Sequence, residues 1–231
     1  MRIILCRVSK DEVVITIKDD TKYLLANYSR NMVSTYRIQE LVNDDFEIKV
    51  TCKIDWQTIV KSNQNFTGVV CFNGAHFGIL CKIYDGQPVI SAEVWSEDND
   101  EHIVNEAHVL ISKDKLDEED WRDITLVYKK NKSISIKTDE GEKITEIQGK
   151  ILDYQNAYLW IGCCDNHMPT PQEFRGDWFG QIKYIHIKGK KEYFGKYEFN
   201  KKTRYKIYDS SGNGNHLISK YLNDGGHIIV Y

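Results

Sequence analysis

Apolar and polar residues alternate along nearly the whole chain, and this alternation is the feature that most constrains the fold. In the segment FEIKVTCKI, every second side chain from Phe46 to Ile54 is apolar and those between are polar. A period of two residues is typical of a half-buried β-strand. The pattern predicts strands at residues 2–8, 12–18, 46–54, 68–73, 77–84, 88–95, 122–129, 133–138, 157–162, 181–187, 196–199 and 226–231.

Turn sequences separate several of these segments, whereas helix signals are rare. YDGQP, KKNK and TDEGEK have the residue types that tight turns between strands prefer. Helical character is found at residues 34–41 and 112–121, where Ser112 is the expected N-cap. Many short strands with close turns and almost no helix predict an all-β fold, an antiparallel β-sandwich of the jelly-roll type.

Composition and charge exclude several classes of protein. The chain has 231 residues, a net charge of -3 and scattered lysines and arginines, so an electrostatic nucleic-acid binder is not expected. We predict no membrane span and see no signal peptide in the first residues. The chain is therefore expected to work inside a cell, to leave by lysis or a special route, or to have lost an export signal. A virion, cell-surface or extracellular location is favoured over the cytoplasm.

Six cysteines raise the question of disulfide bonds. Cys52 and Cys81 lie on the apolar faces of their predicted strands, where a free cysteine packs as a small hydrophobic residue. We predict buried, reduced thiols at both positions, consistent with synthesis in a reducing cytosol. Cys163, Cys164 and His167 do not predict a zinc site, because adjacent strand residues point to opposite faces and further paired ligands are missing.

Five phrases, read in order, carry a resemblance to a known superfamily. They are DDFEIKVTCKID at 44–55, LDEEDWRDITLVYKKNKSISIKTDEGEKI at 116–144, AYLWIGCCDN at 157–166, FRGDWFGQIKYIHI at 174–187 and YDSSGNGNHL at 208–217. Together they resemble the concanavalin A-like lectin/glucanase superfamily, in its laminin-G-like and pentraxin-like branch. The resemblance implies a jelly-roll sandwich with a buried tryptophan at Trp121.

The order of these phrases departs from that of the family in one respect. The glycine-rich phrase usually stands near the beginning of a module, whereas here it follows the closing strand. We therefore predict that residues 193–231 complete the same sandwich in a rearranged order. Residues 41–231 are expected to form a single laminin-G-like domain, with residues 1–40 as an N-terminal extension whose strands join the sandwich.

The glycine-rich loop YDSSGNGNHL has two interpretations. We predict a tight corner that holds the C-terminal strand, with Gly212 or Gly214 at positive φ and Asp209 accepting hydrogen bonds from amides. The alternative, which the resemblance implies, is a calcium site at Asp209 and Asn213. An EF-hand is not predicted, because a lysine stands where the bidentate glutamate belongs.

Candidate ligand-binding residues lie mainly on loops and strand ends, where rigid sheets present binding groups. Aromatic faces stack on sugar rings, and Asn, Asp and His side chains bond sugar hydroxyls. The candidates are Asn73, His76, Tyr84, Trp95, Asp165, Asn166, His167 and Trp178. Trp56, like Trp95 and Trp178, either stacks on a sugar ring or covers the edge of the core. Trp121 and Trp160 are predicted to lie in the core.

Catalytic signals are weak. Glucanases of the superfamily carry carboxylates at alternate positions of one strand. Here Glu93 and Glu97 flank Trp95 without that pattern, and the acidic residues that follow Trp95 are predicted to form a solvated loop. We therefore expect no enzyme and no cofactor other than calcium.

Taken together, the sequence favours a non-catalytic recognition or adhesion domain that binds carbohydrate. The alternative is a phage or viral structural protein, for tail or capsid decoration, whose sandwich makes protein–protein contacts. A glycoside hydrolase or lyase is less favoured. The expected partner is a glycan or another virion or cell-surface protein.

Overall fold

The computed structural model describes residues 13–14, 17–18, 21–22, 24–26, 32–37, 39–61, 66–72, 77–116, 120–152, 158–162, 180–189, 193–198, 206–214 and 216–219. Within these residues, two antiparallel sheets pack face to face around one hydrophobic core, and a small two-stranded sheet of β2 (Ile17–Lys18) and β3 (Thr21–Lys22) stands apart. The predicted all-β antiparallel sandwich is confirmed.

The first large sheet has eight strands among the described residues, in the order β1-β4-β16-β6-β11-β12-β13, with β17 also paired to β16. The bounds are β1 Val13–Val14, β4 Leu24–Ala26, β6 Phe46–Ile54, β11 Arg122–Lys129, β12 Ser133–Thr138, β13 Gly141–Glu146, β16 Gly180–Gly189 and β17 Tyr193–Glu198. β6, β11 and β12 occupy the ranges that the alternation predicted.

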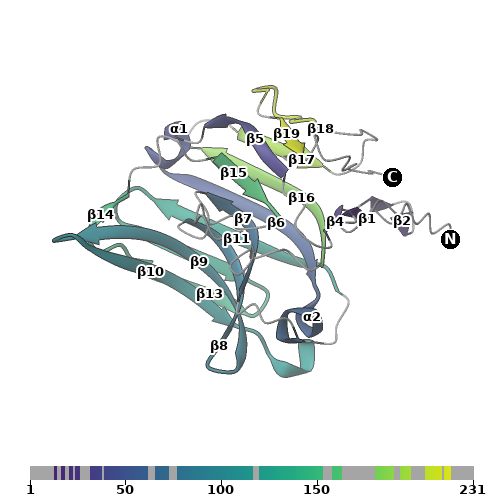
Figure 1. The fold of residues 1–231 in the computed structure, drawn as a ribbon, viewed down its shortest axis with the longest axis horizontal. Coiled ribbons are helices and arrows are strands. Elements are labelled where there is room, and N and C mark those ends of the chain that lie inside the picture. Colours follow the sequence, from purple (N-terminus) through teal and green to yellow (C-terminus); the bar gives the residue numbers. More distant parts are fainter. Residues whose placement is uncertain are drawn as a thin grey trace.

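The second large sheet has nine described strands, in the order β10-β9-β8-β7-β15-β5-β19-β18, with β14 paired to β9. The bounds are β5 Met32–Arg37, β7 Phe66–Phe72, β8 Phe77–Tyr84, β9 Gln87–Asp98, β10 Glu101–Leu110, β14 Lys150–Ile151, β15 Tyr158–Ile161, β18 Lys206–Ile207 and β19 Leu217–Ser219. In Figure 1, β9 and β10 run side by side to a common tip at the left of the view.

The N-terminal segment (residues 1–40) and the C-terminal segment (residues 193–231) each contribute strands to both sheets. From residues 1–40, β4 pairs with β16 in one sheet and β5 pairs with β15 in the other. From residues 193–231, β17 joins the eight-stranded sheet, while β18 and β19 join the nine-stranded sheet. The predicted completion of the sandwich by the C-terminal segment is confirmed for these strands.

Helices are short, and both predicted helices need correction. β5 runs through Arg37, so residues 34–41 are helical only in α1 (Gln39–Val42). The β-branched and aromatic residues of that segment favour a strand. Residues 112–121 contain only a 3₁₀ turn at Lys113–Lys115, and Ser112 makes no side-chain cap. Helix α2 (Trp56–Lys61), at the lower end of the sheets in Figure 1, was not predicted.

The core consists of the inward-facing side chains of both sheets, closed at one end by α2. The rings of Phe46, Phe72, Phe77 and Tyr128 pack at centroid distances of 5.1 to 6.1 Å. Trp56 is only 1% exposed, so of its two interpretations, stacking on a sugar or covering the edge of the core, the structure supports the second. The reason is local: the Asp55 carboxylate accepts a hydrogen bond from the Thr58 amide at 2.9 Å, which starts α2 and turns the indole inward.

Two predictions for core residues have different outcomes. Cys52 and Cys81 are buried free thiols, as predicted, and burial raises the pKa of both well above the ordinary value, so they stay protonated at neutral pH. Trp121 is not buried in the core but partly exposed, beside the ammonium groups of Lys53 and Lys183. It lies just before β11, outside the alternation that directs side chains inward. The side chain of Trp160 lies outside the described residues.

The acidic residues after Trp95 are exposed to solvent, as predicted, but they form the tip of a hairpin and not a loop. β9 continues to Asp98, β10 starts at Glu101, and the two strands form one hairpin. The turn residues Asn99 and Asp100 have φ of 50° and 66°. Two consecutive positive φ values match the twist of a two-residue hairpin turn, and Asn and Asp tolerate them better than most residues.

We expect Gly78→Ala to destabilise the fold much more than Gly141→Ala. The two glycines have similar φ, 156° and 147°, but a Cβ on Gly78 would lie 2.2 Å from the carbonyl oxygen of Val70. A Cβ on Gly141 meets nothing within 4 Å. Because strand backbone cannot yield as a side chain does, Gly78→Ala should lower the free energy of unfolding by about 3 kcal/mol. Urea unfolding of both variants measures the difference, and equal losses would contradict the packing argument.

Candidate functional site

Charged and aromatic side chains gather on the outer face of the nine-stranded sheet, the side turned away from the core. Along β8, Ile79 and Cys81 enter the core, so the alternate residues Lys82 and Tyr84 belong to the outer face. The same alternation applies along β9 and β10, where Ala92 and Ala107 are core residues. We name as the outer-face cluster Lys82, Tyr84, Ser91, Glu93, Glu106 and His108.

Two tight hairpins bring these residues together. The β8–β9 turn uses Asp85 and Gly86 with φ of 49° and 72°, again a two-residue turn that fixes the strand register. Across β9 and β10, Glu93 is opposite Glu106 and Ser91 is opposite His108. The local turn chemistry therefore aligns three consecutive strands with polar groups on one face.

Lys82 links the two carboxylates of the outer-face cluster. Its Nζ forms ion pairs with Glu93 and, at 3.0 Å, with Glu106 Oε2. Ser91 Oγ donates a hydrogen bond to Glu93 Oε1 at 3.1 Å. The side chains of Glu93 and Lys82 are only 6% and 18% exposed, so the network is held largely out of water.

Tyr84 and His108 form the accessible part of the cluster. Tyr84 is 54% exposed, and its ring lies 5.4 Å from the His108 ring, tilted by 35°. His108 Nδ1 lies 3.4 Å from Glu106 Oε1, a buried oxygen without a hydrogen-bond partner among the described residues. One end of the cluster is therefore the accessible Tyr84–His108 pair, and the other is the largely buried ion network of Lys82 and Glu93.

Burial and mutual attraction set the charges of this network. Burial raises the pKa of Glu93; Lys82 opposes this effect and Glu106 adds to it. Burial alone would lower the pKa of Lys82, but its attraction to the two carboxylates outweighs the burial, so the pKa is raised. Lys82 therefore remains an ammonium ion, shared between two carboxylates.

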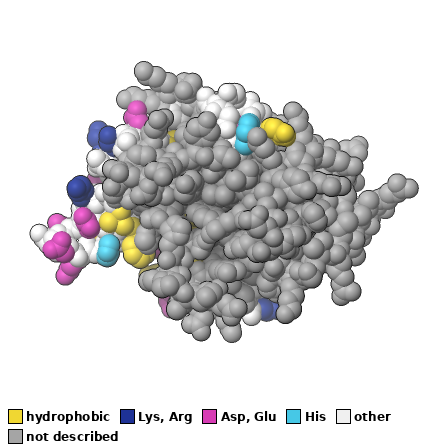
Figure 2. Space-filling view, turned by 45° about the horizontal axis from the view of Figure 1, so that its top comes forward, with side chains coloured by type: hydrophobic (Ala, Val, Ile, Leu, Met, Phe, Trp, Pro, Cys, Tyr) yellow, Lys and Arg dark blue, Asp and Glu magenta, His cyan; other side chains and the backbone are white. Residues whose placement is uncertain are grey.

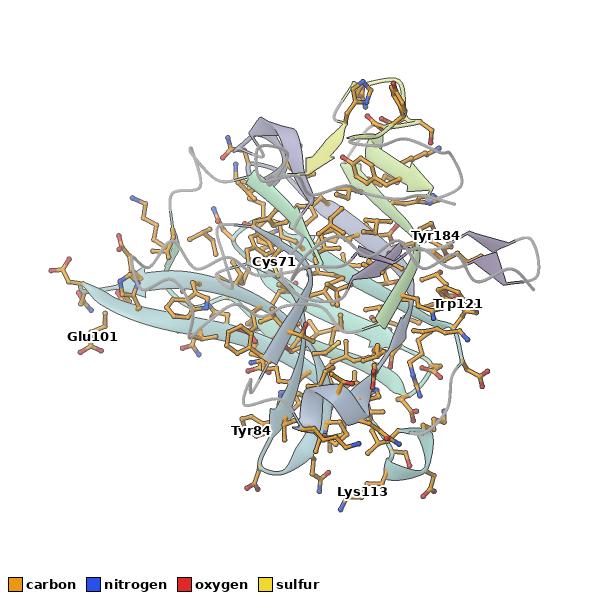
Figure 3. The ribbon with its side chains drawn as sticks, turned by 45° about the vertical axis from the view of Figure 1, so that its right-hand side comes forward. Cys71, Tyr84, Glu101, Lys113, Trp121 and Tyr184 are labelled. Carbon is orange, nitrogen blue, oxygen red and sulfur yellow. The ribbon has the colours of Figure 1, made fainter. Side chains whose placement is uncertain are left out.

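The structure places two of the predicted ligand residues on this face and leaves them apart. Tyr84 ends β8 beside the turn, at the lower end of the view in Figure 3. Tyr84 is opposite Gln87, and Trp95 lies eight residues farther along β9. Trp95 is partly buried, and its ring lies 6.1 Å from the His102 ring. The other predicted residues lie outside the described residues: Asn73, His76, Asp165, Asn166, His167 and Trp178.

Beyond Trp95 the hairpin of β9 and β10 projects past the end of β8. Its exposed tip is acidic, with Glu97, Asp98, Asp100 and Glu101, and Figure 2 shows acidic side chains grouped at the left of the molecule. Figure 3 shows Glu101 at the far end of the hairpin. The tip is a solvated turn and contributes nothing to the outer-face cluster.

Sequence reasoning missed Lys82, Glu106 and His108. A signal existed for Lys82, because it has the same parity in its strand as Tyr84 and the opposite parity to Cys81. Glu106 and His108 were missed together with β10, since the acidic run before it had been assigned to a loop. Pairing the two hairpins in register would have brought all three to one face.

The glycine-rich loop is a corner between strands, as predicted. Gly212 and Gly214 have φ of 94° and 74°. The carboxylate of Asp209 accepts hydrogen bonds from the Ser211 amide at 2.8 Å and the Ser211 hydroxyl at 2.7 Å. Asp209 Oδ1 also accepts one from the Lys196 amide at 2.9 Å, which ties the loop to β17.

Two further expectations concern a metal site and a membrane span. No group of three or more His, Cys, Asp or Glu side chains in the described part of the chain is arranged to hold a metal ion. Calcium at Asp209 and Asn213 stays a prediction. No helix among the described residues is both long and apolar enough to cross a membrane.

Solved structures resemble this chain in fold, but no sequence comparison finds a relative. No protein-family model and no curated protein matches the chain. Matching solved structures include domains LG4-5 of the mouse laminin alpha1 chain, with 12% identity over 72% of this chain and a TM-score of 0.45. An alginate lyase from Pseudomonas aeruginosa matches with 11% identity over 76% of the chain and a TM-score of 0.42. The binding domain of botulinum neurotoxin DC in complex with SialylT matches with 10% identity over 80% of the chain and a TM-score of 0.39.

The share of the matching structure that this chain covers differs among the three matches. The chain covers 42% of the laminin structure, 86% of the lyase and 41% of the toxin structure, so it spans less than half the length of two of them. At TM-scores below 0.5 and such low identity, we base no argument about ligand or activity on them. The fold itself, two packed antiparallel sheets, agrees with the antiparallel β-sandwich predicted from the sequence.

Proposed function

We propose that the chain is a non-catalytic recognition domain that binds carbohydrate at the outer-face cluster. The observation that carries the proposal is the ion network of Lys82, Glu93 and Glu106, held beside the exposed ring of Tyr84. Sugars need hydrogen-bond donors and acceptors in fixed positions together with an apolar surface for their C–H groups. The cluster offers both on one face.

The energetic cost of the network supports a role in binding. Removing charges from water is expensive, and well-packed apolar residues of similar volume often stabilise a fold as well or better. Ser91 and Glu93 are buried although they lie outside the hydrophobic core, and Lys82 and Glu106 are partly buried beside them. Its groups are fixed before a ligand arrives, which lowers the entropy lost on binding.

The same contacts argue against hydrolysis. A retaining glycosidase needs one carboxylate free to attack and a second carboxyl group able to donate a proton. Here Glu93 and Glu106 share the Lys82 ammonium. Both carboxylates are therefore engaged in a way that suits hydrogen bonding to hydroxyl groups better than either catalytic role.

The test begins with a glycan array on the purified chain, followed by titration calorimetry with the best ligand. We expect Tyr84→Ala to weaken binding about tenfold or more, a loss of ~1.4 kcal/mol. The matched control is Tyr208→Ala. Tyr208 is 51% exposed and its ring lies 5.3 Å from that of His216, so it reproduces the Tyr–His pair far from the cluster.

Three outcomes would contradict the proposal. The array detects no glycan, Tyr208→Ala weakens binding as much as Tyr84→Ala, or the chain cleaves the glycan that it binds. The first favours the protein–protein alternative, and the last favours a hydrolase or lyase.

A further inference from the structure

Two lysines converge on one tryptophan on the outer face of the eight-stranded sheet. Lys53 lies near the end of β6, Lys183 lies at a bulge in β16, and Trp121 directly precedes β11. The Nζ atoms of Lys53 and Lys183 lie 5.4 Å and 5.7 Å from the centre of the Trp121 ring. Figure 3 shows Trp121 beside the strand that carries Tyr184, away from the end that carries Tyr84.

The attraction of each ammonium to the ring is modest, whereas the two ammonium groups repel each other. A cation over an indole face at an accessible site gains about 0.5–1 kcal/mol. The ring therefore has two positive charges within 6 Å of its centre and neutralises neither. A negative group placed between them would be attracted by both.

Other lysines on the same strand and the neighbouring strand are neutralised. Lys49, also on β6, pairs with Glu47 at 3.2 Å, and Lys129 on β11 pairs with Asp45 at 3.3 Å. Among the described residues, by contrast, neither Lys53 nor Lys183 forms an ion pair with a carboxylate.

Asp120 and Asp123 are the described carboxylates nearest in sequence to Trp121, and that of Asp123 is already engaged. Its Oδ1 accepts a hydrogen bond from the Thr51 hydroxyl, and Thr51 is opposite Asp123 in the register of β6 and β11. No ion pair joins this carboxylate to Lys53 or Lys183 in the described structure. Asp120 forms no ion pair with either lysine, so among the described residues the two ammonium groups have no carboxylate partner.

We infer that Trp121, Lys53 and Lys183 form a binding site for an acidic saccharide, with a sulfate or carboxylate group between the two ammonium ions. The partly exposed indole would take the apolar C–H face of the sugar ring, as aromatic residues commonly do. The negative substituent would supply the missing counter-charge. This site lies on the other sheet from the outer-face cluster and does not depend on it.

Dextran, carboxymethyl dextran and dextran sulfate of equal length share one backbone and differ in their anionic group. We expect the chain to bind one or both anionic forms at least tenfold more tightly than dextran, and the preferred form identifies the anion as sulfate or carboxylate. The variant Lys53→Gln/Lys183→Gln should lose at least tenfold in affinity. Trp121→Leu should weaken binding without changing the charge.

The control variant is Lys49→Gln/Lys188→Gln, which alters the same two strands and the same number of charges. It should change affinity less than twofold, and thermal unfolding checks that every variant is folded. An equal loss in the control would overturn the inference, because general electrostatics would then explain binding. Equal affinity for the three dextrans, or equal binding of a single-stranded DNA of matched charge, would overturn it too.

Discussion

Trp56→Ala should lower the free energy of unfolding by about 3–5 kcal/mol, the cost of emptying a large buried aromatic position. The indole is 1% exposed and belongs to the core cluster at the end of the sandwich that α2 closes. For a chain of this length, the loss corresponds to a Tm lower by roughly 6–20 °C. Urea unfolding followed by circular dichroism measures the change.

Trp121→Ala is the matched control for Trp56→Ala. The same side chain is removed, but from a partly exposed position beside two lysine ammonium groups. The loss should be smaller than for Trp56→Ala, because part of the Trp121 indole is already exposed to water in the folded chain. A larger loss for Trp121→Ala than for Trp56→Ala would restore the original assignment of Trp121 as the core tryptophan.

Lys82→Met should destabilise the fold by about 3–5 kcal/mol at neutral pH, because it leaves two carboxylates in a mostly buried site without their counter-ion. Unlike a core substitution, this loss should depend on pH. Burial already raises the pKa of Glu93 in the native chain, and Lys82 is the group that opposes the rise. Removing Lys82 raises that pKa further.

The direction of the pH dependence follows from proton linkage. A carboxyl group whose pKa is higher in the folded state than in the unfolded state binds its proton more tightly when folded. The stability from this proton is fully present below the unfolded pKa of about 4.3 and is lost as pH rises through the folded pKa. The deficit of Lys82→Met should therefore shrink between pH 7 and pH 5.

Urea unfolding of both chains at pH 5, 6, 7 and 8 tests this expectation. The double variant Lys82→Met/Glu93→Gln removes the charge that Lys82 had balanced, so it should recover stability at neutral pH and show a weaker pH dependence than Lys82→Met. A deficit that stays constant across this range would mean that Lys82 acts through packing alone.

Period-two alternation was enough to predict most of the central strands. β6, β8, β11 and β12 have the predicted ends because each is a strand-favouring segment bounded by a turn or a break. The glycine-rich corner was also predictable, since Gly212 and Gly214 supply the positive φ that it needs. In these cases local chemistry and the tertiary structure favour the same conformation.

The failures have a common cause: the composition of a segment does not show which strand it pairs with or which cap it forms. Acidic residues after Trp95 suggested a loop, yet the register with β9 extends β10 through Glu101. Trp56 follows a strand end, and its burial depends on the cap that Asp55 forms at α2. Alternation assigns a side chain to a face but does not show which residues of other strands share it, so Lys82 could not be joined to Glu106 in advance.

The position of β19 has a consequence for the order in which the sheet is assembled. Ser34 in β5 is opposite Leu217 in β19, so two segments separated by most of the chain are hydrogen-bonded neighbours. The hairpins of β8, β9 and β10 close over a few residues and can form early, whereas β5 gains its second neighbour only after residue 219 has been synthesised. Distant pairings of this kind slow folding, because the loop must close before the contacts form. On the ribosome, β5 would therefore be made among the first strands and completed among the last, with one backbone edge open to other chains during translation.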